Sequence, residues 1–95
     1  MAQVSTELHE HIDYILDHLI QLWQDLPRVE KEIGQWDLVE QIDYVEEWTP
    51  REELRRKLER YAAKGLLGKS QLERYAKLQR LVSENEAILA RLRNS

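Results

Sequence analysis

Residues 8–36 read LHEHIDYILDHLIQLWQDLPRVEKEIGQW and place an apolar side chain alternately every four and three residues. The positions are Leu8, Ile12, Ile15, Leu19, Leu22, Leu26, Val29, Ile33 and Trp36. This spacing puts one apolar stripe along an α-helix, as in a heptad seam. Pro27 lies in the stripe, and a proline inside a helix costs about 3 kcal/mol. We therefore expect a helix over about residues 5–24 that is kinked or broken near Pro27, followed by a piece that faces the same neighbour.

The rest of the chain predicts further helices. Asp37 can cap a segment that runs to Trp48 and turns Leu38, Ile42, Val45 and Trp48 inward. Thr49 and Pro50 are typical of an N-cap and a first helical residue, with Glu52 completing the capping box. That helix is expected to end near Gly65. A last helix, capped by Ser70 or one turn earlier by Gly68, runs to about Arg93.

The amino-acid composition limits the possible folds, the possible kinds of site and the cellular compartment. The 95 residues are rich in helix formers, poor in glycine and proline, and contain no cysteine, which excludes disulfides, thiolate nucleophiles and cysteine zinc sites. The sequence predicts an all-α, compact bundle of four to five helices in one domain, 1–95, with a C-terminal helical hairpin around Gly65–Ser70. The first seven residues lack a basic and an apolar run, and no long apolar stretch follows. We expect a cytoplasmic protein that does not enter a membrane.

The charges divide the chain into two halves of opposite sign. Twelve Asp/Glu and two Lys/Arg in residues 1–49 give −10, and twelve Lys/Arg and six Asp/Glu in residues 50–95 give +6, for a net −4. One half can cover the other, two copies can pair acidic to basic, or the basic half can face an anionic partner. We favour helical layers that cover each other, within one chain or across a dimer. Acids of residues 7–47 would then lie near bases of residues 51–80.

The segment Ala63–Ser70 fits a phosphate-binding loop, with alanine in place of the first glycine. Such a loop follows a buried strand, whereas a helix is predicted here, so we do not expect nucleotide hydrolysis. The N–H groups that open the last helix leave Lys69 and Ser70 as a candidate anion site, against the simpler reading of a helix cap.

Metal and catalytic sites find little support. His9, His11 and His18 lie among acids, but a solvated polar face explains them better than metal ligation, because no second helix offers the Glu-x-x-His pair of a di-metal site. No serine is framed by the glycines of a nucleophile elbow. We therefore predict a protein that is not an enzyme, with no catalytic, cofactor or metal residues.

The basic half is the chemical alternative. Arg55, Arg56 and Arg60 are candidate nucleic-acid contacts, as in a small antitoxin-like regulator. Against this, several of the basic residues have an acid four residues earlier, a spacing that favours ion pairs along a single helix. The pairs are Glu52 with Arg56, Glu53 with Lys57, and Glu73 with Lys77. The net charge of −4 also opposes approach to nucleic acid.

The last helix carries a second seam, which is the predicted interaction surface: Tyr75, Leu78, Val82, Asn85, Leu89 and Leu92. Asn85 either fixes the register of an interface or turns to solvent. Trp23, Trp36 and Trp48 are expected in the core.

The hairpin segment has a pattern of apolar residues and glycine made by Leu58, Tyr61, Gly65, Leu66, Leu67 and Leu72. This pattern resembles that of the short C-terminal helical hairpins called SHOCT domains. Leu72 stands where that family usually has Phe, and Gly68 where it has Thr. The resemblance implies oligomerisation.

Together these features predict a non-enzymatic protein–protein interaction or regulatory module that acts by helix–helix association. Two wide apolar stripes are more than a chain of this size easily buries, so we expect a homodimer, a larger homo-oligomer or a helical protein partner.

Overall fold

A computed structural model describes residues 5–94 and is helical throughout, with no strand in that range. The helices are α1 (Thr6–Glu32), α2 (Leu38–Glu46), α3 (Trp48–Ala63) and α4 (Lys69–Arg93), with a 3₁₀ turn, η1 (Ile33–Gln35), after α1. The predicted all-α class is confirmed. The residues at the start of the chain that bear on the compartment prediction, 1–4, lie outside the described residues.

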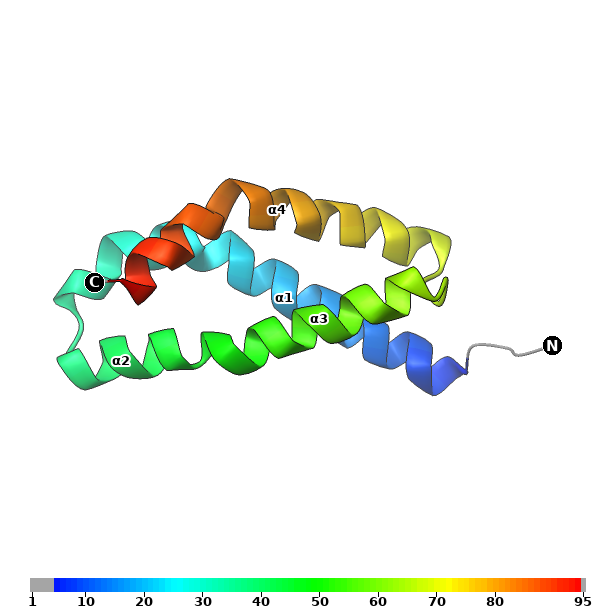
Figure 1. The fold of residues 1–95 in the computed structure, drawn as a ribbon, viewed down its shortest axis with the longest axis horizontal. Helices are drawn as coiled ribbons and strands as arrows, with labels where there is room; N and C mark the ends of the chain where they lie inside the picture. Colours follow the sequence, from blue (N-terminus) through cyan, green and yellow to red (C-terminus); the bar gives the residue numbers. More distant parts are fainter. Residues whose placement is uncertain (1–4, 95) are drawn as a thin grey trace.

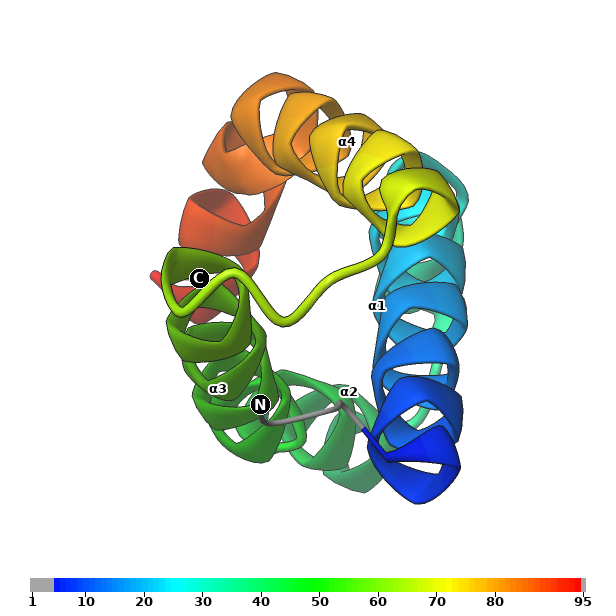
Figure 2. The same ribbon diagram turned by 90° about the vertical axis from the view of Figure 1, so that its right-hand side faces the viewer.

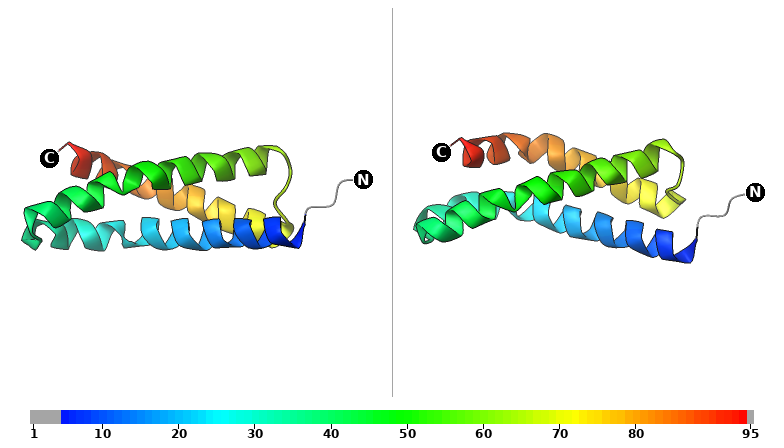
Figure 3. Two further views of the ribbon diagram at one scale, coloured as in Figure 1. Left: turned by 90° about the horizontal axis from the view of Figure 1, so that it is seen from below. Right: turned by 60° about the horizontal axis from the view of Figure 1, so that its bottom comes forward.

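The four α-helices form three rods rather than a bundle of four to five helices, so that part of the prediction is wrong. Only Glu47 separates α2 from α3, its backbone is helical (φ −62°, ψ −19°), and the two helices follow one line (Figures 1 and 3). The interruption has a local cause, because Pro50 has no N–H to give to the Glu46 carbonyl. The α2–α3 rod runs antiparallel to α1 and α4 in a molecule of 53 × 22 × 17 Å (Figure 1).

Of the kink or break predicted near Pro27, the break is absent, because α1 continues through Pro27 to Glu32. The proline removes one hydrogen bond, but Leu26 and Val29 are buried on either side of it and hold the helix in phase. The start of α1 is capped by the Ser5 hydroxyl, which accepts from the Leu8 N–H at 3.0 Å.

The other helix ends agree in part with the sequence. Thr49 is not an N-cap, since α3 begins at Trp48 and both Thr49 and Pro50 lie in its first turn. Gly65, with φ +73°, ends the hairpin's first helix as predicted. Gly68 rather than Ser70 caps α4, and its N–H donates to Gln71 Oε1 at 2.8 Å.

The core is built around α1. Its buried side chains meet Trp48, Leu58 and Leu67 from the α3 side and Leu78, Val82 and Leu89 from α4. Of the three tryptophans predicted in the core, Trp23 and Trp48 are there and touch edge to face with ring centres 5.1 Å apart, whereas Trp36 is half-buried outside the core cluster. The most extensive helix contact is α1 with α4, whereas α3 and α4 lie apart and are joined by their connecting turn (Figure 2).

Candidate protein interaction surface

The α2 helix leaves three of its apolar side chains in solvent. It has no buried residue, and Leu38, Val39 and Ile42 are exposed by 66%, 61% and 47%. The prediction that Leu38, Ile42 and Val45 turn into the core with Trp48 is therefore wrong for the two exposed residues, while Val45 is half-buried. The physical reason is a shortage of neighbours, because α2 lies at the end of the bundle beside the last turn of α4 (Figure 1).

An apolar groove of about 290 Å³ adjoins this face. Ile33, Ile42 and Val45 line one side and Leu92 of α4 the other, with Glu46 and Arg93 also contributing to its lining. We call Leu38, Val39, Ile42 and this groove the α2 face.

A second, more polar groove lies between α3 and α4. Its larger part, about 500 Å³, includes Trp23, Val82 and Leu89, with Thr49, Glu53 and Arg56 of α3. A smaller part of about 210 Å³ shares Arg55, Val82 and Glu86 and reaches Tyr75. The side of the bundle between α3 and α4 is therefore open along much of its length.

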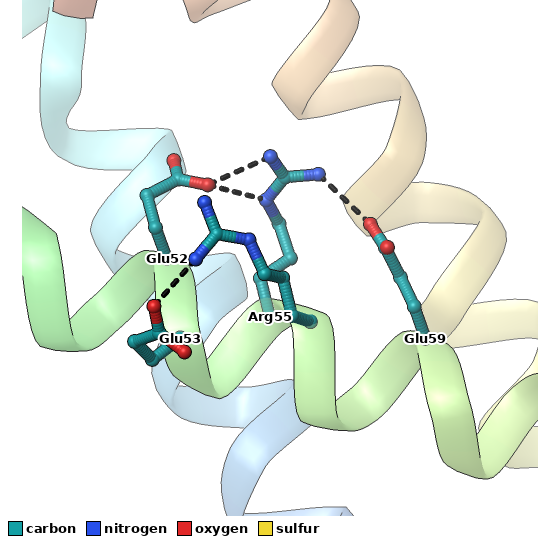
Figure 4. Close-up of polar contacts among 5 residues, drawn as sticks. Glu52, Glu53, Arg55 and Glu59 are labelled. Carbon is teal, nitrogen blue, oxygen red and sulfur yellow. Dashed lines mark hydrogen bonds and ion pairs between the residues drawn. The ribbon is translucent and has the colours of Figure 1, made fainter.

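The arginines predicted to contact nucleic acid are largely paired on their own helix (Figure 4). Arg55 lies between Glu52 and Glu59, with Nη2 donating to Glu52 at 2.7 Å and Nη1 to Glu59 at 3.1 Å. Arg56 pairs with Glu53. These pairs join Glu52 to Arg55 and Glu53 to Arg56, three residues apart, instead of the predicted spacing of four. Arg60 is exposed.

Charged contacts between distant segments join α1 to α4. Arg74 donates to Asp17 at 3.0 Å and also to Asp13, and Gln71 Nε2 donates to Asp13 at 2.9 Å. The hydrogen bonds from Gln71 and Arg74 lower the pKa of Asp13. Arg91 makes two hydrogen bonds with Glu30, at 2.8 and 3.0 Å. The expected pairing of acids in 7–47 with bases in 51–80 is thus found within the chain at Arg74, while Arg55 and Arg56 pair within α3.

The seam predicted as an interaction surface is used inside the chain. Leu78, Val82, Asn85 and Leu89 are buried, and Tyr75 and Leu92 are half-buried against the core. Asn85 neither turns to solvent nor reaches another helix, because its Nδ2 donates to the Leu81 carbonyl at 2.9 Å.

The remaining candidate residues do not assemble into a site. Within residues 5–94, no group of three or more His, Asp and Glu is placed to hold a metal, and His18 stacks on Tyr14. The strand that a phosphate-binding loop requires is replaced by α3, and Lys69 and Ser70 are exposed at the start of α4. Over the same range, no helix combines the length and apolar character needed to cross a bilayer.

Sequence reasoning missed two features of this surface. One is the exposure of α2, which its five acids and absence of bases between residues 37 and 47 could have indicated. The other is the stacking of Arg51, whose guanidinium lies 5.5 Å from the centre of the Tyr44 ring and 5.1 Å from that of Trp48. This contact fastens the start of α3 to α2.

Comparison of the chain with known protein families, with curated proteins and with solved structures finds no match. The resemblance to SHOCT hairpins therefore gains no support from the family comparison.

Proposed function

We propose that this protein is a non-enzymatic protein–protein interaction module that works by helix–helix association and self-associates. The observation that carries the proposal is the α2 face, where three large apolar side chains on a nine-residue helix stand in solvent beside an apolar groove. Contiguous exposed apolar residues are typical of binding surfaces, whereas single exposed apolar residues are common on any protein.

The shape of the α2 face suits a helical partner. A groove between two helices, bordered by a glutamate and an arginine, can take the side chains of a third helix and orient it by charge. The open side between α3 and α4 continues along the same face, because Arg93 lines both grooves.

Catalysis and nucleic-acid binding have less support. A catalytic carboxylate has to reach a substrate held in a cleft. Glu52, Glu53 and Glu59 instead pair with arginines along α3. The same pairing reduces the positive charge that an antitoxin-like regulator would present through Arg55 and Arg56.

Sedimentation equilibrium at micromolar concentration tests the proposal. We expect a mass about twice the 11.4 kDa of one chain. Replacing both Leu38 and Ile42 by Ser should weaken association at least about a hundredfold, since each replacement removes apolar area worth about 1.4 kcal/mol or more, a factor of about ten, when covered.

Leu72→Ser is the matched control, because Leu72 is also exposed, by 49%, but lies on α4 near the hairpin turn. It should leave the association unchanged. A concentration of about 100 µM is high enough to populate a dimer with a dissociation constant on the order of micromolar. A protein that stays strictly monomeric at this concentration would refute self-association.

A further inference from the structure

One exposed stripe follows the whole α2–α3 rod. On α2 it consists of Leu38, Ile42 and Glu46, and it continues with Arg56 and Arg60 of α3 and with Lys64, the residue that follows the last turn of α3. These positions recur at intervals of four within each helix, so they lie on one side of each helix. All six are exposed. Four residues of the stripe line the two grooves that open toward α4: Leu38, Ile42, Glu46 and Arg56.

The two ends of this stripe carry opposite charge. Residues 37–47 hold five acids and no base, whereas residues 55–64 hold five bases and only Glu59 as an acid. If α2 of one copy met α2 of another, ten acids would gather at one contact, which like-charge repulsion opposes. An antiparallel arrangement avoids this, because it sets each acidic end against a basic end.

We infer, on the basis of the proposed function, that the partner of the α2 face is the α2–α3 rod of a second copy, packed antiparallel across a twofold axis. A register that sets Glu46 opposite Arg56 also sets Ile42 opposite Arg60 and Leu38 opposite Lys64. In the same register Thr49 of each copy lies opposite Glu53 of the other copy, and the twofold axis passes between these two contacts. Each contact occurs twice.

This register satisfies both the charges and the apolar side chains. The aliphatic parts of Arg60 and Lys64 can cover Ile42 and Leu38 while their charged ends stay in water near the acids of α2. Arg56 is available for a new partner because its present pair with Glu53 is well exposed, with 58% and 65% of the two side chains in solvent. Such pairs are weak and exchange readily.

Complementary charge reversal tests the register. In Glu46→Arg both contacts of the homodimer become Arg against Arg, and in Arg56→Glu both become Glu against Glu. Each variant alone should therefore dissociate at least about tenfold more readily. In an equimolar mixture, a heterodimer recovers an arginine against a glutamate at both contacts. We expect native mass spectrometry to find this heterodimer in preference to either homodimer.

Glu84→Arg serves as the matched control, because Glu84 is exposed on α4 and lines neither groove. It should leave the mass distribution unchanged. Helical circular dichroism of each variant shows that it is folded, and rescue in the mixture excludes unfolding as the cause of dissociation.

Three other results would overturn the inference. A dimer insensitive to both reversals would refute this register while leaving self-association in place. Tighter association of Glu46→Arg, with no heterodimer preference, would indicate contact between two α2 helices. A monomeric unmodified protein would refute the inference and self-association together.

Discussion

Asp13 is the residue at which the two charge halves of the chain meet most directly. Because hydrogen bonds from Gln71 and Arg74 lower its pKa, the ionised carboxylate favours the folded state. Its contribution is therefore present above the pKa of the unfolded chain, about 3.9, and is lost as the pH falls through the lower folded value.

Arg74→Gln should accordingly reduce the free energy of unfolding by about 0.5 to 1 kcal/mol at pH 7, a modest value because the pair is partly open to solvent, with 32% of the Arg74 side chain and 45% of the Asp13 side chain exposed. At pH 2 the difference from the unmodified protein should shrink. Urea unfolding at the two pH values measures this. Arg80→Gln replaces an exposed arginine of α4 and should have little effect at either pH, and an equal loss there would contradict the role given to Arg74.

Pro27 shows how a helix can override a local breaker. Apolar burial on both sides of it keeps α1 continuous, but the missing hydrogen bond still lowers the stability of the helix. Pro27→Ala should raise the free energy of unfolding by about 1 to 3 kcal/mol. The gain is smaller if the proline ring packs against neighbouring side chains, because that packing is lost in the variant. A thermal melt checks this, and a lower melting temperature would mean that the ring's packing outweighs the hydrogen bond.

The helix ends that could be predicted are those with a local chemical cause. Gly65 adopts a positive φ that other residues resist, and Gln71 reaches back from the first turn of α4 to the N–H of Gly68. Pro27 and Thr49 misled because their effect depends on context. The first was outweighed by the buried stripe, and the second lies one residue inside a helix that begins at Trp48.

At the scale of the molecule, the all-α class and the buried stripe of α1 followed from periodicity, while the candidate site did not. Which face of α2 is covered depends on where α4 ends in space, and Leu92 and Arg93 are the residues of α4, as far as the structure describes the chain, that line the groove. The partner of the α4 seam was equally hidden in the sequence, since an apolar stripe looks the same whether it meets α1 or another chain.

All three rods share one core, so a single cavity should weaken the whole molecule. Leu78 is 1% exposed and packs in the cluster that joins α4 to α1 and α3. Leu78→Ala should cost about 2 to 5 kcal/mol, a large share of the about 5 to 15 kcal/mol expected for a small domain. Urea unfolding followed by tryptophan fluorescence and by circular dichroism should show the same lowered midpoint. Different midpoints would indicate that the rods unfold separately.

The pairing of α1 with α4 has a consequence for how the protein is made. α1 leaves the ribosome before α4, and the helix that covers most of its apolar stripe is completed only when residue 93 has been added. At translation rates of about 5 to 20 residues per second, the nascent chain carries that uncovered stripe for on the order of seconds. During this interval the nascent chain is most open to chaperones and to aggregation, and the interval ends when α4 docks.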